Sequence, residues 1–416
     1  MLATENGIEP STPSESARNA PDAGDDIATD RPKLLFVINE GHFFMWSQGV
    51  AAKHAQDAGF EIHVAAPDDH VWAATGYSND DMREHGFHFH ALPLSRRGVN
   101  PLEDLRTLFQ VYRLMRRLRP SLVHVITIKA ILYGGLSARL MGVPTVATVA
   151  GLGHLFTSTQ LSMRLLRSLV LRFYKLTIGH RRSRIICLNP ADEAQMIDGG
   201  VITSDRMHRV GGAGVDLIRF QPRPKPSGDA DGAPVAILPA RLIWEKGVDD
   251  FVEAARLLRQ RGVAVRFALV GDTHPSNPRA VPEESLRAWH EESLVEWWGR
   301  REDMDMVMAE ADMVCLPSRY GEGLPTVLAE AAASARPCIA SDIPGCREAV
   351  VPGETGLLVP PGDVARLADA IESLALDPAR RADYGAAGRR LAEARFSDAA
   401  VARDHLTIYR AVLAQA

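Results

Sequence analysis

Short apolar runs alternate with amphipathic segments through the first half of the chain. The runs have the continuous hydrophobic character of strands that are buried on both faces of a parallel sheet. We expect strands at Lys33–Asn39, Glu61–Ala65, Phe87–Leu92, Leu122–Ile126, Thr145–Val149 and Arg184–Leu188. We expect helices at Ser47–Ala58, Pro101–Leu118, Tyr133–Met141 and Leu161–Ile178, and a loop at Glu40–Phe44. This alternation predicts βαβ units and a parallel sheet.

The alternation restarts after Gln221–Pro234, a segment rich in proline, glycine and aspartate that is typical of a linker. Further strands are expected at Val235–Pro239, Arg266–Val270, Val295–Trp298, Met313–Leu316, Cys338–Ala340 and Thr355–Leu358, with helices at Gly247–Arg261, Met304–Ala309 and Pro325–Ala333. The fold class is therefore α/β, with two doubly wound, Rossmann-like domains. Ligands bind beyond the carboxyl ends of such strands, so two facing sheets would place the site in the interdomain cleft.

These patterns predict the domain boundaries. Residues 1–30 are rich in Ser, Pro, Ala, Asp and Glu, show no signal-peptide pattern and are expected to be disordered. The first domain is expected over 31–212, the hinge or linker over 213–234 and the second domain over 235–395. Residues 396–416 are expected to form a C-terminal helix that packs back on the first domain.

Composition and cysteine spacing indicate a cytoplasmic globular protein. Hydrophobic residues make up 46% of the chain and charged residues 24%, and no apolar run is long enough for a membrane span. The four cysteines, Cys187, Cys315, Cys338 and Cys346, form no C-x-x-C pair and are expected to be buried thiols in a reducing compartment.

The net charge of −5 is unevenly distributed along the chain. Residues 86–190 contain 16 Lys and Arg but only two acids, a charge of +14 that leaves −19 on the rest. Such a field favours an anionic partner near the first half, although a solvated basic surface is the alternative explanation.

The segment Arg319–Ala333, RYGEGLPTVLAEAAA, has the character of an anion-binding turn and helix. Glycines flank Glu322, and Pro325 suits the first position of the following helix, whose free N–H groups can face a phosphate. Glu330 lies eight residues after Glu322, within this helix. Two carboxylates beside a diphosphate need hydroxyl partners, and a sugar nucleotide supplies them on its hexose and its ribose. A capped helix with a solvated acid is the alternative.

Two cations and a glycine follow the neighbouring strands. Arg241 and Lys246 lie on the loop ARLIWEKG and could neutralise a diphosphate, unless they are ordinary surface cations. Gly271 ends the strand of LVGD and would allow close backbone approach to a ligand.

The ordered series ARLIWEKG, LVGD, EWWGRREDM, ADMVCLPSRYGEGLPTVLAEAAA, PCIASDIPGCREAV and GETGLLVPPGD resembles glycosyltransferase family 4, with the GT-B fold. The resemblance covers Val235–Asp363, and it continues more loosely through the first half. It implies a retaining sugar transfer, with an acceptor-binding first domain and a nucleotide-sugar-binding second domain.

The resemblance also implies residue roles. Arg241 and Lys246 would hold the donor diphosphate, and Glu330 would bind the ribose. Glu322 would lie against the donor sugar, with the backbone of Gly323, Leu324 and Thr326 touching sugar and phosphate. Residues near Arg300 would border the base.

The first half departs from the family pattern. A histidine that many members carry directly after the strand TVATV is Ala150 here, and the nearest candidate for that catalytic role is His154 in GLGH. The short Gly-Gly loop after the first strand is replaced by EGHFF, in which we interpret His42 as a loop residue.

No cofactor and no metal is expected. The Asp303-Met304-Asp305 motif lies at a helix start, where acids favour the helix dipole.

The segment Leu161–Ile178 is a basic amphipathic helix. Arg164, Arg167, Arg172 and Lys175 lie largely on one face, and leucines and other apolar residues cover the rest. Such a helix can lie on an anionic membrane, or it can be a core helix with one solvated face. Loose similarity to the subgroup that extends polyprenyl-diphosphate-linked sugars favours a lipid-linked acceptor and peripheral association with the inner face of the plasma membrane.

Other functions fit the sequence less well. An NAD-dependent oxidoreductase would need a strand followed by G-x-G-x-x-G and a later acid, and none is present. A soluble acceptor, a sugar-nucleotide epimerase or hydrolase, and a non-catalytic nucleotide-sugar-binding module remain alternatives. Nucleic-acid binding is not expected, because the basic region lacks interleaved aromatics and an RNA-binding motif.

Overall fold

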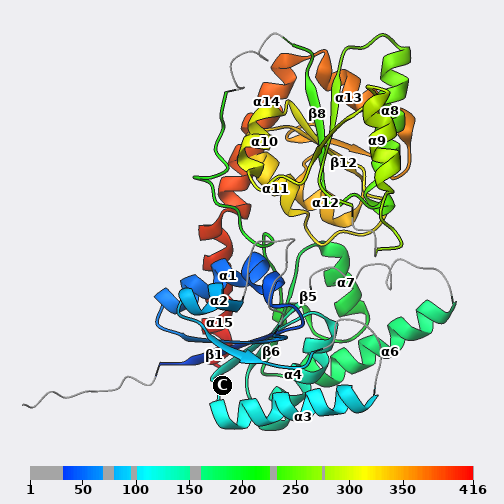
Figure 1. Cartoon of the computed structure of the whole chain (residues 1–416). Helices are drawn as coiled ribbons and strands as arrows, with labels where there is room; N and C mark the ends of the chain where they lie inside the picture. The colour runs from blue at the N-terminus through cyan, green and yellow to red at the C-terminus, as the bar shows by residue number, and fades with distance from the viewer. Residues whose placement is uncertain are drawn as a thin grey trace, which may run out of the picture. The chain divides into compact units, whose positions relative to one another are not determined.

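A computed structural model describes residues 31–68, 79–94, 101–149, 161–224, 232–273 and 277–415. The predicted tail at 1–30, part of the linker and the 150–160 loop with Ala150 and His154 lie outside these ranges. The described chain forms two parallel α/β sheets (Figure 1), as expected for the GT-B fold.

The first sheet has the strand order β3-β2-β1-β4-β5-β6-β7. Every neighbouring pair is parallel; for example, Leu35 pairs with His63 on one side and with Val123 on the other. The strands are β1 Lys33–Ile38, β2 Glu61–Ala66, β3 His88–Ala91, β4 Leu122–Ile126, β5 Thr145–Val149, β6 Ser183–Cys187 and β7 Met207–Arg209. The helices around it are α1 Gly41–Asp57, α2 Asn79–Glu84, α3 Pro101–Leu118, α4 Ile128–Met141, α6 Leu161–Ile178 and α7 Pro190–Asp198.

The second sheet has the order β10-β9-β8-β11-β12-β13 and is also parallel. Its strands are β8 Val235–Pro239, β9 Arg266–Val270, β10 Glu296–Gly299, β11 Met313–Leu316, β12 Cys338–Ser341 and β13 Gly356–Val359. Its helices are α8 Val248–Gln260, α9 Glu283–Glu291, α10 Met304–Glu310, α11 Thr326–Ala333, α12 Pro344–Ala349, α13 Val364–Ala375 and α14 Pro378–Leu391.

Side chains of alternate strand residues build a core on each face of each sheet. In the first sheet, Leu34 and Phe36 pack with residues of α1 and α15 (Asp398–Leu413), whereas Leu35 and Val37 pack with residues of α3, α4 and α6. In the second sheet, Ala236 and Leu238 face α8, and Val235 and Ile237 face α11.

The C-terminal helix α15 packs against α1 of the first sheet (Figure 1). Its Tyr409 is buried, and the hydroxyl lies 2.8 Å from Nδ1 of the buried His124 on β4. The other ring nitrogen of His124 lies 2.7 Å from the hydroxyl of Thr148 on β5. Burial lowers the pKa of His124 well below its usual value, so the neutral ring belongs to this hydrogen-bonded core.

Three helix predictions are wrong in detail. The helix expected from Ser47 begins at Gly41, so the expected loop at Glu40–Phe44 is largely the first turn of α1, and the backbone of His42 is helical. The helix expected from Tyr133 begins at Ile128. Pro325 is the N-cap of α11, not its first residue.

Candidate active site

The loop after β11 carries the carboxylate at the centre of the candidate site. Glu322 Oε1 accepts hydrogen bonds from Lys246 Nζ at 2.5 Å and from Ser318 Oγ at 2.7 Å. The side chains of Lys246 and Glu322 are each only 13% exposed. This largely buried ion pair joins the loop after β11 to the loop after β8, at the carboxyl end of the second sheet.

A glycine allows these two loops to meet. Lys246 ends a 3₁₀ turn, Trp244–Lys246, and the following Gly247 has φ 72° in the left-handed region. A Cβ on Gly247 would lie 2.1 Å from the carbonyl oxygen of Pro317, so both the backbone conformation and the close contact require glycine. Lys246 Nζ also lies 6.0 Å from the ring centre of Tyr320, which gives the cation a second partner in this loop.

Arg319 connects the loop after β11 to the start of α8 through hydrogen bonds to two aspartates. Its Nε lies 2.8 Å from Asp250 Oδ2, its NH2 also bonds Asp250 Oδ1, and the same NH2 lies 2.8 Å from Asp249 Oδ2. Asp250 is buried, whereas Arg319 is partly exposed. The Arg319 guanidinium thus forms a bidentate contact with Asp250. This geometry fixes the orientation of the two side chains as well as pairing their charges.

Glu330 stands on α11, one turn beyond the helix start. The carboxyl is partly enclosed and receives no hydrogen bond or ion pair from any residue that the structure describes. Desolvation raises the pKa of Glu330 to about 7, and the opposing effect of Arg219 is smaller. An enclosed carboxyl without a partner can accept hydrogen bonds from ligand hydroxyls.

The remaining residues of the predicted donor side include glycines that pack closely against neighbouring backbone. Gly271 follows β9, and a Cβ there would lie 2.0 Å from the carbonyl oxygen of Ala240. Gly345 at the start of α12 packs so closely that a Cβ would lie 2.4 Å from the carbonyl oxygen of Gly323. Leu324 is buried and Thr326 is the first residue of α11. Close backbone packing therefore holds the turn that precedes α11.

The two predicted arginines have different environments. Arg241 is exposed, and no described residue pairs with it. Arg300 is partly exposed and lies 3.2 Å from Glu302, its neighbour two residues away. The structure thus brings Lys246 and Glu322 together and leaves Arg241 open to solvent.

Arg319 and Tyr320 lie within the segment that was singled out from the sequence but were assigned no role there, and Ser318 and Asn189 were missed. Asn189 follows β6 of the first sheet and caps α7, and its side-chain amide donates to the carbonyl oxygen of Gly323 at 3.1 Å. The Asn-Pro pair at the helix start was the available signal for the cap. The contact with Gly323 had no sequence signal. It joins loops that follow the carboxyl ends of strands in both sheets.

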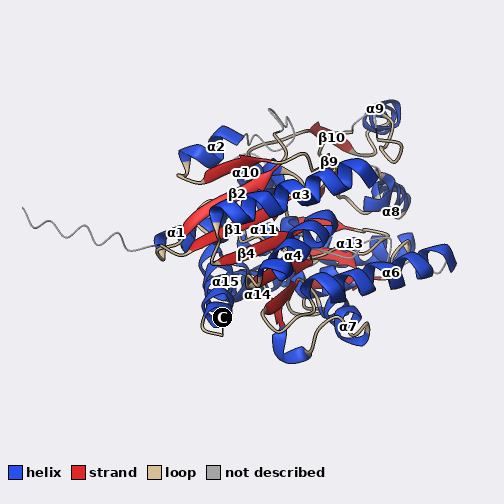
Figure 2. Cartoon of the chain, turned by 90° about the horizontal axis from the view of Figure 1, so that it is seen from below, coloured by secondary structure: helices blue, strands red, loops and turns tan. Residues whose placement is uncertain are grey.

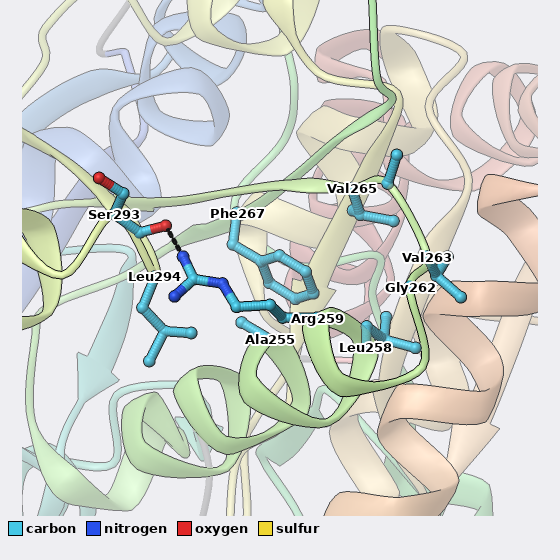
Figure 3. A pocket seen from close by; sticks show the side chains of 10 residues that line it. Ala255, Leu258, Arg259, Gly262, Val263, Val265, Phe267, Ser293 and Leu294 are labelled. Carbon is cyan, nitrogen blue, oxygen red and sulfur yellow. Dashed lines mark hydrogen bonds between the residues drawn. The ribbon is translucent and has the colours of Figure 1, made fainter.

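A shallow pocket of about 270 Å³ lies elsewhere in the second domain (Figure 3). Leu258 and Arg259 of α8, Phe267 of β9 and Leu294 line it, and Arg259 donates to the carbonyl oxygen of Ser293. The pocket lies at the amino end of β9, whereas ligands of such sheets bind beyond the carboxyl ends. We therefore assign the candidate site to the Lys246–Glu322 region.

All four cysteines are free and buried, as predicted. Burial raises the pKa of the thiol of Cys338 to about 12 and of the other three further, so none is a reactive thiolate near neutral pH.

Comparison with known proteins agrees with this geometry. The model for glycosyl transferases group 1 matches residues 233–377, and the model for glycosyl transferase 4-like proteins matches residues 33–181. A GDP-mannose-dependent alpha-mannosyltransferase of Mycobacterium tuberculosis is 30% identical over 81% of this chain and 85% of its own. An N,N'-diacetylbacillosaminyl-diphospho-undecaprenol alpha-1,3-N-acetylgalactosaminyltransferase of Campylobacter jejuni is 26% identical over 78% of this chain and 84% of its own.

A solved structure shares the fold. Anabaena HepE, crystallised with UDP, superposes with a TM-score of 0.72 at 19% identity, covering 91% of this chain and all of its own. The two parallel sheets, the site geometry and the matched relatives lead to one conclusion: this chain belongs to the glycosyltransferase group 1 (family 4) proteins and is a glycosyltransferase of the GT-B fold.

Proposed function

We propose that this enzyme moves a hexose or an N-acetylhexosamine from a nucleoside-diphosphate sugar to a hydroxyl of a lipid-linked saccharide in bacterial surface polysaccharide synthesis, with retention of anomeric configuration. The Lys246–Glu322 pair beside the start of α11 carries this proposal. Lys246 and the exposed Arg241 would meet the diphosphate, and Glu322 would face hydroxyls of the sugar. Glu330 would accept from the ribose hydroxyls. His154 remains the candidate catalytic residue of the acceptor side.

The proposed route is front-side displacement. The bond between the anomeric carbon and the departing phosphate oxygen breaks through an oxocarbenium-like state. The acceptor oxygen then attacks from the same face, and its proton passes to the departing phosphate. The protein's part is to position both substrates and to stabilise charge on the leaving group.

UDP is the preferred nucleotide in this proposal, and the acceptor is a polyprenyl-diphosphate saccharide. The supporting relatives are the Campylobacter enzyme named above and a UDP-Gal:alpha-D-GlcNAc-diphosphoundecaprenol alpha-1,3-galactosyltransferase of Escherichia coli, 26% identical over 71% of this chain and 76% of its own. The mycobacterial relative uses GDP-mannose, so GDP-sugars are the first alternative.

Catalysis is proposed to need no metal. Within the described residues, the acids of the Asp-Met-Asp motif are already paired with arginines: Asp303 with Arg301 at 2.7 Å, and Asp305 with Arg223 at 3.1 Å and Arg219 at 3.5 Å. Carboxylates that arginines already neutralise are poor ligands for Mg²⁺ or Mn²⁺ beside a diphosphate.

The decisive experiment combines donor binding with transfer. UDP-, GDP- and ADP-sugars are screened by thermal shift, where a donor at 100 times its Kd adds about 2.7 kcal/mol of stability. The best donor is then incubated with a polyprenyl-diphosphate saccharide in excess chelator, and NMR reads the anomeric configuration of the product. An inverted product or a strict metal requirement contradicts the proposed mechanism. Donor turnover without acceptor identifies an epimerase or hydrolase, and transfer only to soluble sugars identifies the other acceptor class.

The pKa of Glu330 predicts how donor binding depends on pH. Because the pKa of Glu330 is higher in the folded state than in the unfolded state, the protonated carboxyl contributes to folding stability. That contribution is fully present below pH 4.5, the pKa of the unfolded state, and is lost as the pH rises through about 7. If the ionised form accepts the ribose hydroxyls, binding releases a proton. Nucleoside diphosphate should then bind about tenfold tighter at pH 8 than at pH 6, because the ionised fraction of a group titrating near pH 7 changes by that factor.

Calorimetry in buffers of different ionisation enthalpy measures this proton release. A Glu330→Gln variant provides the control: its affinity should be weaker at pH 8 and nearly independent of pH. A 2′,3′-dideoxynucleotide should likewise lose the dependence. Equal pH dependence in wild type and Glu330→Gln would remove Glu330 from the ribose-binding role.

Helix α6 favours the membrane hypothesis over the core-helix alternative. Leu166, Leu169, Phe173 and Leu176 are 45–48% exposed and recur at helical spacing. The exposed Arg164, Arg172 and Lys175 lie beside this stripe, whereas Arg167 is only partly exposed. A core helix would have buried these apolar side chains.

Helices α3 and α6 flank α4 on one side of the first sheet (Figure 2). On α3, Leu102, Leu105 and Phe109 are 59–80% exposed at the same helical spacing, and Leu140 of α4 is 69% exposed. Exposed arginines accompany them on α3, namely Arg106, Arg113, Arg116 and Arg117. Within the described ranges no helix is long and apolar enough to span a bilayer. We propose that this apolar and basic surface lies on the anionic cytoplasmic leaflet.

Liposome co-sedimentation tests the surface. Vesicles with anionic lipid should bind the enzyme, and Arg172→Gln/Lys175→Gln should lower partitioning about thirtyfold, since each cation near such a surface contributes about 1 kcal/mol. Leu169→Glu/Phe173→Glu should abolish binding, whereas Leu376→Glu, a change at an exposed leucine of the second domain, should not. Equal binding to neutral vesicles would contradict the proposal.

A further inference from the structure

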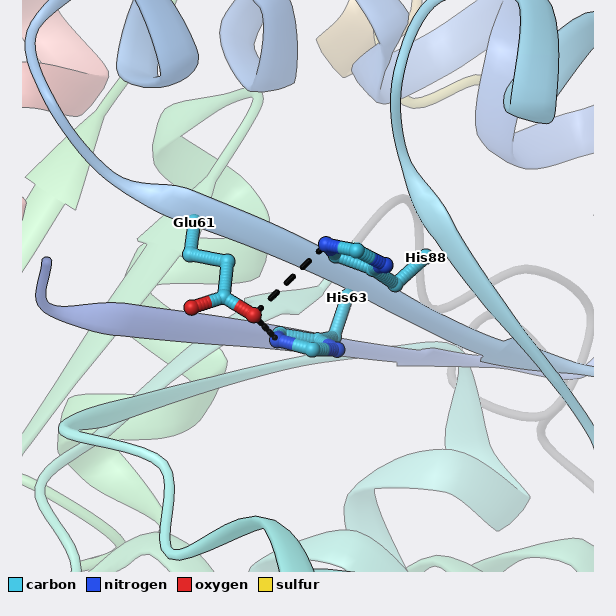
Figure 4. Close-up of side chains that lie close together, drawn as sticks. All are labelled: Glu61, His63 and His88. Carbon is cyan, nitrogen blue, oxygen red and sulfur yellow. Dashed lines mark hydrogen bonds and ion pairs between the residues drawn. The ribbon is translucent and has the colours of Figure 1, made fainter.

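Strands β2 and β3 lie at one edge of the first sheet, and they bring the imidazoles of His63 and His88 close to the carboxylate of Glu61 (Figure 4). His63 and His88 pair directly in the parallel register, and Glu61 and His90 lie two residues from them on the same faces of their strands. Glu61, His63 and His88 each offer a ligand atom, and these atoms lie within 4.8 Å of one another. None of these residues belongs to the candidate donor site.

The spacing of the ligand atoms fits a small transition-metal ion. Glu61 Oε1 lies 2.9 Å from His63 Nε2 and 3.6 Å from His88 Nε2. In a tetrahedral zinc site with bonds of about 2.0–2.1 Å, neighbouring ligand atoms are about 3.3–3.4 Å apart. The two observed separations bracket that value, so sub-ångström shifts of the Glu61 carboxylate and the exposed His88 ring would complete a three-ligand face. The fourth position would face solvent and take water.

His90 provides the support that metal-binding histidines usually have. His63 Nδ1 lies 3.0 Å from His90 Nε2, and the two rings stack. When His63 Nε2 binds a metal, its Nδ1 carries the proton and donates to His90, which fixes the orientation of the ring. His63 is also buried at the base of the site, with its side chain only 5% exposed, whereas His88 is 58% exposed at the rim.

We infer that Glu61, His63 and His88 form a site for one divalent transition-metal ion, with Zn²⁺ as the best-fitting ion, and that His90 orients His63. The ion would tie the short edge strand β3 to β2. Imidazole and carboxylate ligands suit Zn²⁺ and exclude a Ca²⁺ or Mg²⁺ preference, because those ions require oxygen ligands. This role is structural and independent of the proposed transfer reaction.

The test uses the full chain expressed without a polyhistidine tag. Titration with Zn²⁺ against a chromophoric chelator should show one ion per chain, and Co²⁺ should give the intense visible band of a four- or five-coordinate ion. His88→Ala should abolish both signals, and His90→Gln should weaken binding about 10- to 100-fold. His85→Ala is the control, because His85 is an exposed histidine on the neighbouring loop whose Nδ1 lies 2.7 Å from the backbone carbonyl oxygen of Asp81, outside the cluster.

Thermal unfolding provides a readout other than metal content. Zn²⁺ should raise the Tm of wild type and of His85→Ala, but not that of His88→Ala, whose exposed side chain can be removed without unfolding the sheet. If wild type and His88→Ala bind Zn²⁺ equally, or if neither binds at micromolar concentration, the cluster is only a hydrogen-bonded sheet edge and the inference fails. Glycosyl transfer in excess chelator is measured separately, so failure of one proposal leaves the other standing.

Discussion

Lys246→Ala is expected to lower kcat for glycosyl transfer by about 10²–10³, which corresponds to about 2.7–4 kcal/mol of barrier. The lysine is expected to stabilise negative charge on the departing diphosphate, a charge that is larger in the transition state than in the bound donor. Lys246 also pairs with Glu322, which lies 2.5 Å away. Removing Lys246 therefore leaves the carboxylate of Glu322 without its cation, next to the proposed binding position of the donor phosphates.

Glu322→Ala should cause a comparable loss for a different reason. Lys246 would keep its charge but lose the partner that, with Ser318, holds it in place. Because each variant removes the same pair, the effects should be far from additive, and the double variant should resemble the worse single variant. Steady-state kinetics with saturating donor and acceptor measure kcat, and the loss should fall mainly on kcat.

A surface ion pair provides the matched control. Lys53 and Asp57 on α1 are also 2.5 Å apart, but their side chains are about half exposed. Lys53→Ala should leave kcat within twofold of wild type. Near-normal turnover in both Lys246→Ala and Glu322→Ala would overturn the assigned roles.

The central strands could be predicted closely because they are short apolar runs buried on both faces. The strands Leu122–Ile126 and Thr145–Val149 have the predicted bounds. By contrast, α1 begins six residues earlier than predicted. Its N-cap, Glu40, makes no side-chain capping bond, and its first turn has no acid, so the usual signals of a helix start are missing. The short edge strand β7, Met207–Arg209, is largely polar and was also missed.

The candidate site could be predicted only as a list of residues. Sequence spacing placed Lys246 and Glu322 on loops after neighbouring strands, but the two residues are 76 positions apart and no sequence signal shows that their side chains pair. The histidine cluster was missed for the same reason: His63 and His88 meet only through the register of β2 and β3. Contacts set by strand register and loop packing require the folded structure.

Arg319→Ala is expected to lower the free energy of unfolding by about 2 kcal/mol, because it leaves the carboxylate of Asp250 buried without its cation. The full penalty for breaking a buried pair is about 3–5 kcal/mol. Two features reduce it here: the Arg319 side chain is 38% exposed, so water can partly replace it, and Asp250 lies in the first turn of α8, where the helix dipole favours an acid. Urea unfolding with a matched m-value measures the loss.

The control is Arg287→Ala, which breaks an exposed pair with Glu283 at 2.6 Å on α9 and should cost at most about 0.5 kcal/mol. Adding Asp250→Asn to Arg319→Ala should recover part of the lost stability, because the uncompensated charge is then gone.

The loss of Arg319 should affect activity as well as stability. Arg319 joins the loop after β11 to α8 through Asp250 and Asp249, and it touches no proposed ligand atom. Arg319→Ala should therefore lower kcat, through a looser Glu322 loop, and lower the urea midpoint at the same time. A variant that loses stability but keeps full kcat would show that the Glu322 loop does not depend on this clamp.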